Sequence, residues 1–366
     1  RFKCDWSSDV CSSDLWNWIV PGPTTTEFTY IMFDWDNIFA SMLALVDSDV
    51  PLAKRIAYSN FIQIIKSRTI NGFVPNWSAG GWKSVDRSEP PVGSKVLLDI
   101  YTRFGDKWLV EFLYDDLLAW HEWNWGYRVL PQSGLLCLGS QLCENGTYCI
   151  GNARAESGLD QNPMWDCPGA DDDGNGGDCY SFFNPETHQM QLSVVGMSSL
   201  FVMEAYALAN LSVAIGRPDG PRLLQRANLM GELLRTKAWD DQGKAFTNIL
   251  GNGTFYRRIA PTSFYPLITG HPTAAQATQM VQTWLLSPEH FCIDISGGWP
   301  HNTKNPDTCF WGMPSIEAVT LPFSNLFYSL SLLSFLPRSF SFFLFSSPCF
   351  SSFLFLSHIN RQTEVI

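Results

Sequence analysis

Three carboxylate residues lie close together in the segment 153–166, which reads ARAESGLDQNPMWD. They are Glu156, Asp160 and Asp166, and the segment follows neither a helical nor a strand period. Cleavage of a glycosidic bond requires one carboxylic acid to protonate the leaving oxygen, and a second carboxylate to activate water or attack the anomeric carbon. The residues therefore suggest acid–base chemistry on a sugar, with a solvated acidic loop as the alternative interpretation.

Asp160 has the surroundings expected of the acid. The pKa of a carboxyl rises when the group is buried against aromatic side chains or lies near another carboxylate. Glu156 precedes Asp160 by four residues, and Trp165 follows it. Gly158, between the two acids, permits the backbone to approach a ligand closely.

Asp166 is a poor choice for the second carboxylate. In a helix it would be offset from Asp160 by about 9 Å, within the range of an inverting glycosidase. However, two acids of one segment do not easily reach opposite faces of the same sugar, and Pro163 lies between them. We therefore do not assign the second role to Asp166.

The composition favours a neutral small-molecule substrate. The chain has 366 residues, of which 45% are hydrophobic, and this is enough for a sizeable core. Its net charge of −11 and the absence of a Lys/Arg cluster argue against nucleic acid and anionic membranes as partners. The 15 tryptophans provide flat faces on which sugar rings stack, although aromatic residues are more often part of a core.

The cysteines and sequons indicate the secretory pathway or the extracellular space. Three loops have a cysteine at each end, which predicts the pairs Cys143 with Cys149, Cys167 with Cys179, and Cys292 with Cys309, and leaves Cys137 free. Four N-glycosylation sequons agree with this setting, and begin at Asn76, Asn145, Asn210 and Asn252. Reduced thiols and chance sequons are the alternative.

Both ends of the chain differ from the part between them. Residues 1–15 contain an imperfect repeat that resembles translated library-adaptor sequence, or form a disordered polar terminus. Residues 317–366 include a Phe/Ser/Leu/Pro-rich run typical of a translated pyrimidine-rich intron. Residues 339–357 are uncharged and have about the length that a bilayer needs. Their serines and Pro348 argue against membrane insertion, and we favour read-through.

Residues 16–316 are expected to form one mainly helical domain. Apolar residues recur every three or four positions in segments 36–48, 51–68, 93–104, 106–127, 191–216, 219–238 and 272–286. We expect Pro51 and Pro272 in first helical turns, and a hairpin over 244–258 that turns at 251–253.

The helical segments come in pairs, and between the pairs lie long connections at 70–92 and 128–190. Long loops in a compact domain usually carry function. The pattern predicts an all-α fold of the α/α toroid type with a pocket on its axis. It has fewer helices than the twelve of six complete pairs, so we expect the toroid to be incomplete. An open helical array is the competing architecture, but no fixed repeat period supports it.

The segment at 153–166 and six further motifs resemble glycoside hydrolase family 63 and its trehalase relatives, whose catalytic domain is an (α/α)6 barrel. The family includes mannosyl-oligosaccharide glucosidase and mannosylglycerate hydrolase-like domains. The motifs occur in the family's order: FDWDNIF at 33–39, GFVPNWSAGGWKSVDRSEPP at 72–91, LLAWHEWNWGYR at 117–128, AWDDQGKAFTN at 238–248, APTSFYPLITG at 260–270 and FWGMPSI at 310–316. The set is specific, whereas any one motif would be weak.

The resemblance implies a role for ten residues. Asp160 is the implied general acid, and Trp35 with Asp36 line the subsite of the cleaved sugar. Further implied substrate contacts and pocket walls are Arg87, Trp120, Trp123, Glu156, Gly158, Asn162 and Trp165. Core packing is the alternative for the tryptophans, a helix N-terminal acid for Asp36, and a plain turn for Asn162.

The sequence departs from the family after Ile316. Family members continue with a Tyr-Trp-Arg-Gly segment and a C-terminal glutamate that acts as general base, and the sequence after Ile316 matches neither. We therefore expect an inverting glycosidase of α-linked glucosides or mannosides that binds an oligosaccharide or small glycoside but hydrolyses little. The alternatives are a trehalase, a carbohydrate-binding pseudoenzyme and a membrane-anchored protein.

We expect neither a cofactor nor a metal. DDDGNGG at 171–177 resembles the first half of a calcium loop, but Phe182 stands where the loop's twelfth residue, an acid, is required. A disulfide-closed, solvated loop is the preferred interpretation. No CxxC or HExxH motif supports a transition metal.

Overall fold

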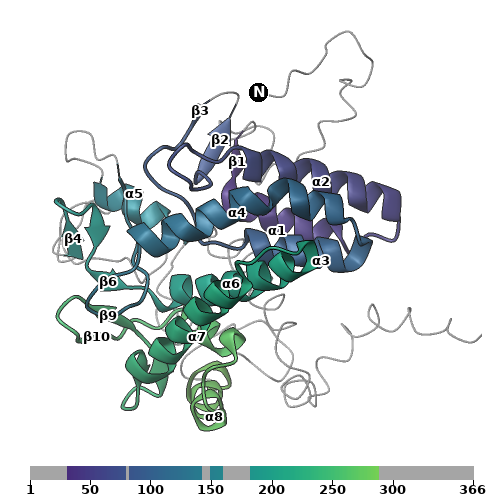
Figure 1. The fold of residues 1–366 in the computed structure, drawn as a ribbon. Coiled ribbons are helices and arrows are strands. Elements are labelled where there is room, and N and C mark those ends of the chain that lie inside the picture. Colours follow the sequence, from purple (N-terminus) through teal and green to yellow (C-terminus); the bar gives the residue numbers. More distant parts are fainter. Residues whose placement is uncertain (1–30, 80–81, 142–148, 160–181, 288–366) are drawn as a thin grey trace, which may run out of the picture.

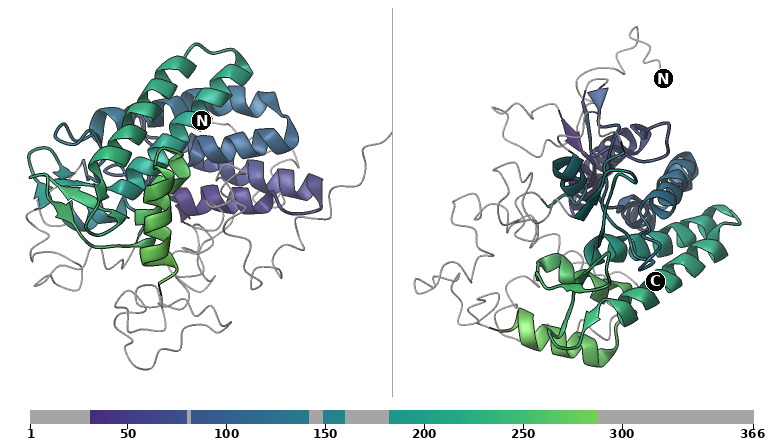
Figure 2. Two further views of the ribbon diagram at one scale, coloured as in Figure 1. Left: turned by 90° about the horizontal axis from the view of Figure 1, so that it is seen from below. Right: turned by 90° about the vertical axis from the view of Figure 1, so that its left-hand side faces the viewer.

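The protein is mainly helical, and this confirms the predicted class. The computed structural model describes residues 31–79, 82–141, 149–159 and 182–287. Figures 1 and 2 show long helices in antiparallel pairs, with short strands beside them. The helices are α1 (Asp34–Ala44), α2 (Val50–Lys66), α3 (Gly93–Phe104), α4 (Lys107–Tyr127), α5 (Cys149–Ala155), α6 (Val195–Ile215), α7 (Gly220–Lys237) and α8 (Ala274–Met280).

The helix ends follow local sequence signals. The Asp49 side chain accepts a hydrogen bond from the Leu52 N–H and caps α2, whose first turn contains Pro51 as predicted. Gly216 adopts a left-handed conformation and ends α6, so that α7 can turn back beside it. Pro272 is not in a first helical turn, because Thr273 is the N-cap of α8. A π-helical turn, Val281–Leu285, follows α8.

Helix α6 is the central element of the fold. It packs against α3, α4 and α7 and against the short 3₁₀ segment η5 (Pro261–Thr269), and nearly all of its side chains are buried. Within the described part of the chain, α6 is the one helix that is long and apolar enough to cross a membrane. Because 72% of that window is buried inside the protein, α6 has the surroundings of a core helix.

Short antiparallel strands join the long connections to the helices. Strands β1 (Met32–Phe33), β2 (Trp77–Ala79) and β3 (Trp82–Lys83) form one sheet, which begins where α1 begins. A second sheet has the order β10 (Phe255–Tyr256), β9 (Asn248–Leu250) and β6 (Leu192–Ser193). The hairpin predicted over 244–258 is confirmed as β9–β10. Two pairs complete the strands: β4 (Phe183–Asn184) with β5 (Gln189–Met190), and β7 (Trp239–Asp240) with β8 (Ala245–Phe246).

Cys137 is a buried free thiol, which confirms that prediction. Burial raises the pKa of the thiol to about 12, so it stays protonated at physiological pH. The three predicted disulfides all involve cysteines outside the described residues, and they stay predictions. The calcium-like loop at 171–177 also lies outside these residues.

A buried carboxylate joins α6 to α3. Glu204 of α6 accepts hydrogen bonds from the backbone N–H groups of Ser94 (2.6 Å) and Lys95 (3.2 Å) in the first turn of α3. The residue before that helix, Val92, has no side chain able to cap it. Burial raises the pKa of Glu204 to about 7, although the hydrogen bonds from Ser94 and Lys95 act in the opposite direction.

Raising the pH from 4.5 to above 7 should therefore weaken the folded state through Glu204. In this pH interval Glu204 is deprotonated in the unfolded chain but still protonated in the folded protein. Because the folded protein binds the additional proton, the free energy of unfolding falls as the pH rises, by up to about 3 kcal/mol. In Glu204→Gln this contribution disappears. Urea unfolding of both proteins at pH 5 and pH 8 measures the difference. An equal pH dependence in the two proteins would contradict the assignment.

Candidate active site

The first turn of α1 is bound to the loop 76–89 by reciprocal hydrogen bonds. Phe33, the N-cap residue, makes no side-chain cap. Instead, the Glu89 carboxylate accepts a hydrogen bond from the Trp35 N–H (2.8 Å), and the Asp34 carboxylate accepts one from the Glu89 N–H (3.1 Å). The backbone carbonyl of Asn76 accepts the Asp34 N–H (3.0 Å). These bonds satisfy donors that a helix start leaves open.

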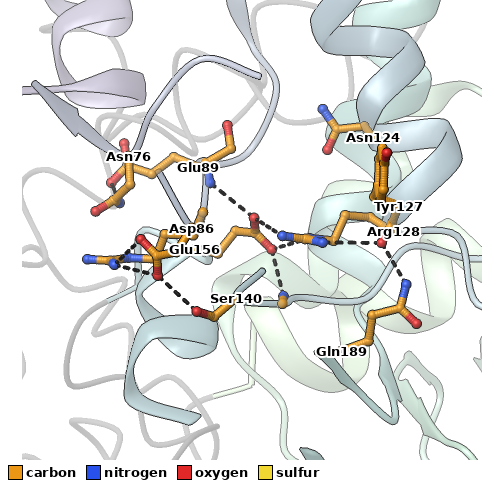
Figure 3. Close-up of polar contacts among 12 residues, drawn as sticks. Asn76, Asp86, Glu89, Asn124, Tyr127, Arg128, Ser140, Glu156 and Gln189 are labelled. Carbon is orange, nitrogen blue, oxygen red and sulfur yellow. Dashed lines mark hydrogen bonds and ion pairs between the residues drawn. The ribbon is translucent and has the colours of Figure 1, made fainter. Parts of the chain in front are cut away.

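Asn76 belongs with Asp34 and Glu89 to a group of buried polar residues around the start of α1, which is called the cluster below. Its amide nitrogen donates to the Glu89 carboxylate (2.8 Å) and to the backbone carbonyl of Ala155 (3.3 Å), and the side chain is buried. Figure 3 shows Asn76 beside Glu89. The Asn76 amide nitrogen, to which a glycan would be attached, is thus enclosed in the folded protein, and glycosylation at this sequon stays a prediction.

Asp34 is a fully buried carboxyl group that the sequence interpretation did not select. One oxygen accepts hydrogen bonds from the Ser88 hydroxyl (3.3 Å) and the Glu89 N–H, whereas Oδ1 has no partner among the described residues. Burial raises the pKa of Asp34 well above its usual value, and the nearby acids Asp36 and Glu156 add to this effect. Asp34 therefore retains its proton to a higher pH than an exposed aspartate.

Glu156 is enclosed by donors from three parts of the chain (Figure 3). The Arg128 guanidinium binds both of its oxygens, through Nε at 2.6 Å and Nη2 at 2.8 Å. The backbone N–H groups of Ser88 (3.1 Å) and Gly139 (2.7 Å) also donate to it. Both partners of the ion pair are almost fully buried. The predicted substrate contact of Glu156 stays a prediction, and the described contacts all serve the protein's own structure.

Gly158 lies against the indole of Trp35. Its φ is +63°, and a Cβ atom at this position would lie 2.6 Å from Nε1 of Trp35. A glycine is thus required both by the left-handed conformation and by the space. The close approach predicted from the sequence is made to Trp35, and it places the turn after α5 directly beside the start of α1.

Trp120 and Trp123 of α4 contact residues of the cluster. Trp120 has no exposed surface, and its indole N–H donates to the Ser88 hydroxyl (2.9 Å). Trp123 packs on Phe73 and lies 4.4 Å from the Arg128 guanidinium. Both tryptophans thus have the core surroundings given above as the alternative to pocket walls.

Of the remaining predicted site residues, the structure describes Arg87 and Asp36. Arg87 is half-buried and donates to both carboxylate oxygens of Asp86 (3.0 Å), and Asp86 accepts a hydrogen bond from Ser140 (2.9 Å). Asp36 lies in the first turn of α1 and is half-buried. Asp160, Asn162 and Trp165 lie outside the described residues.

The structure brings both long connections to one place, since the loop 76–89 and the turn Glu156–Leu159 meet at the start of α1. Glu89 and Arg128 were not selected from the sequence, although both stand in quoted motifs, RSEPP and NWGYR. In the described part of the chain, no group of three or more His, Cys, Asp or Glu side chains is placed to hold a metal ion.

The family model of the mannosylglycerate hydrolase MGH1-like glycoside hydrolase domain matches residues 30–307. The chain belongs to this family. The resemblance to glycoside hydrolase family 63 is thereby confirmed, and the protein is a glycosidase by family. A sequence search among curated proteins finds no match.

Solved structures of related folds agree. An uncharacterized conserved protein from Thermus thermophilus has 18% identity and a TM-score of 0.55, covering 73% of this chain and 71% of its own. A GH63 mannosylglycerate hydrolase from the same organism, in complex with glucose, has 17% identity and a TM-score of 0.50. The match covers 69% of this chain and 70% of that enzyme. Neutral trehalase Nth1 from Saccharomyces cerevisiae has 16% identity and a TM-score of 0.53. The match covers 84% of this chain and 63% of the trehalase. The predicted toroid class is confirmed.

Gly158→Ala should destabilise the protein more than Gly105→Ala does. Both glycines have positive φ, so both variants incur the left-handed strain of about 1–2 kcal/mol, but a Cβ at Gly105 has nothing within 4 Å. The extra loss at Gly158 arises from collision with Trp35. Thermal unfolding of the two variants measures it. Equal losses would show that Trp35 moves aside without cost.

Proposed function

We propose that the protein cleaves α-linked glucosides or mannosides with inversion, and that Asp160 is the general acid. One observation carries this proposal. The turn Glu156–Leu159 is held at Glu156 by Arg128 and at Gly158 by Trp35, so the chain leaves Leu159 beside the start of α1. Asp160 is the next residue, and Asp36 lies in the first turn of that helix.

The charges of the cluster suit an acid that remains protonated. Asp34, Glu89 and Glu156 are buried around Ser88, and the buried guanidinium of Arg128 is paired with Glu156. We propose that this acidic surrounding helps Asp160 to remain protonated, as a general acid requires. Asp36 is proposed to bind sugar hydroxyls.

The substrate class is proposed from the family and its relatives. One solved mannosylglycerate hydrolase contains glucose, and another structure of that enzyme contains Tris and D-glycerate. These are small molecules, and the net negative charge of the chain, without a Lys/Arg cluster in its sequence, favours a neutral sugar unit. We propose a small α-glucoside or α-mannoside. We do not assign a general base to any described residue.

Asp160→Asn should lower the cleavage of methyl α-glucoside or methyl α-mannoside by about 10²- to 10⁴-fold, because it removes the proton donor. Adding azide supplies an external nucleophile: it attacks the anomeric carbon, the bond to the leaving oxygen breaks, and Asp160 protonates that oxygen. Because azide needs no general base to activate it, the experiment tests the acid without requiring that the base be known. NMR of the products reads the configuration, and β-products are expected. Unchanged rates in Asp160→Asn, or α-products, would refute the proposal.

A trehalase is the second candidate, because neutral trehalase Nth1 covers 84% of this chain in the structural comparison. Trehalose carries two glucose units and no aglycone, so a trehalase cleaves it in preference to methyl α-glucoside. Glucose release from both substrates distinguishes the two candidates. Binding of glucose or mannose without any cleavage, with azide present, would indicate a carbohydrate-binding protein instead.

We also propose that the protein belongs to the secretory pathway or the extracellular space. In the exposed hairpin turn, Asn252 Oδ1 accepts hydrogen bonds from the N–H (3.0 Å) and hydroxyl (2.7 Å) of Thr254, and the residue is exposed. Asn210 is exposed on α6.

In protein secreted from a eukaryotic host, a glycan is therefore expected at Asn252 and none at Asn76. Mass spectrometry of peptides released with and without enzymatic deglycosylation checks each position. A glycan at Asn76, whose amide is buried against Glu89, would contradict the arrangement of the cluster.

A further inference from the structure

Arg128 directly follows α4, and its side chain is buried. It is the C-cap of α4, and its backbone N–H donates to the carbonyl of Asn124. Its guanidinium is 1% exposed and forms the two-point contact with Glu156 described above. A third donor, Nη1, binds the carbonyl of Tyr127 (3.2 Å). Figure 3 shows these contacts on one side of the cluster.

The guanidinium packs against Trp123 and against the backbone at Gly139. The ring centre of Trp123 lies 4.4 Å from Cζ of Arg128. A Cβ atom on Gly139 would stand 2.9 Å from Cζ of Arg128 and 2.7 Å from the carbonyl oxygen of His188, so the backbone at Gly139 closes on the guanidinium. The plane of the guanidinium is therefore fixed by packing, and the position of the Glu156 carboxylate is fixed with it.

The turn that follows Glu156 has few supports of its own. Helix α5 has seven residues, and the turn continues it with local bonds such as Ser157 N–H to the Arg154 carbonyl (2.8 Å) and Leu159 N–H to the Ser157 hydroxyl (3.1 Å). Such a short helix has little stability alone. Contacts with distant parts of the chain must hold the turn, and Arg128 provides two of them.

We propose that Arg128 is a positioning residue that fixes the turn Glu156–Leu159 through Glu156 and thereby aligns the general acid that follows it. This inference rests on the proposed function. A general acid works only within hydrogen-bonding distance of the leaving oxygen, and a small displacement strongly lowers the rate. The described hydrogen bonds of the Arg128 guanidinium are with Glu156, at the start of the turn, and with the Tyr127 carbonyl at the end of its own helix.

The test uses the dependence of the rate on the leaving group. Arg128→Lys retains the charge and loses the two-point contact; Glu156→Gln retains the size and loses the charge. In both variants we expect kcat on methyl glycosides to fall by about 100-fold, with KM changed less than about threefold. On 2,4-dinitrophenyl glycosides, which need no acid, kcat should fall less than about tenfold. Azide is present throughout.

Arg68→Lys is the matched control. Arg68 pairs with Asp116 at 2.8 Å in a half-buried contact on α4, away from the turn, so both substrates should retain wild-type rates. A merely structural role of Arg128 would lower kcat in the same proportion on both substrates. That result, or unchanged rates, would overturn the proposal.

Hydrogen exchange separates this inference from the proposed function. In Arg128→Lys, amides of residues 156–159 should exchange at least about tenfold faster, whereas those of α7 should be unchanged. If the wild type cleaves no glycoside, the proposed function fails, and the exchange data still decide whether Arg128 holds the turn. Unchanged exchange at 156–159 would refute the anchor. Unfolding of both variants would also refute it, because the pair would then support the whole fold.

Discussion

The buried ion pair between Arg128 and Glu156 is the interaction on which the arrangement of the cluster depends. Removing two charges from water costs several kcal/mol for each ion, and the cost is offset only if the remaining hydrogen-bonding capacity is also satisfied. The carboxylate achieves this with N–H groups of Ser88 and Gly139. Meeting this demand brings the end of α4, the loop 76–89, the segment around Gly139 and the turn after α5 to one point.

The start of α1 shows the same principle with a different partner set. Its N-cap is a phenylalanine, so the capping oxygen comes from Glu89, which is 54 residues away from Trp35. A distant cap couples the position of a helix to that of a loop, whereas a local cap would stabilise the helix alone. Glu204 does the same for α3 from the middle of α6. In both cases a carboxylate replaces a missing local signal and also joins two elements.

Helices and turns can be predicted from local sequence patterns, whereas hydrogen-bond partners that are distant in the sequence cannot. The long helices follow from apolar periodicity, and their positions were predicted within a few residues at most ends. The hairpin at 251–253 follows from its glycines. The roles of Glu89 and Arg128 depend on residues 54 and 28 positions away, and a period cannot reveal such partners.

The tryptophans and the short strands mark another limit. Helix α4 carries Trp120, Trp123 and Trp125 within six positions, and composition alone does not tell which ring faces a ligand and which faces the core. In the described structure Trp123 packs against Phe73 and Trp120 donates to Ser88, so the described contacts of these two rings are with the core. The strands have two or three residues each, which is too short for an alternating pattern to be recognised.

The central position of α6 has a consequence for synthesis on the ribosome. The apolar faces of α3 and α4 pack in part against α6, which ends 88 residues after α4 does. At translation speeds of roughly 5–20 residues per second, these helices wait about 4–18 s for their partner. During this interval the nascent chain exposes apolar surface that chaperones bind. The order of elements along the gene thus leaves the apolar faces of α3 and α4 uncovered until the core helix emerges.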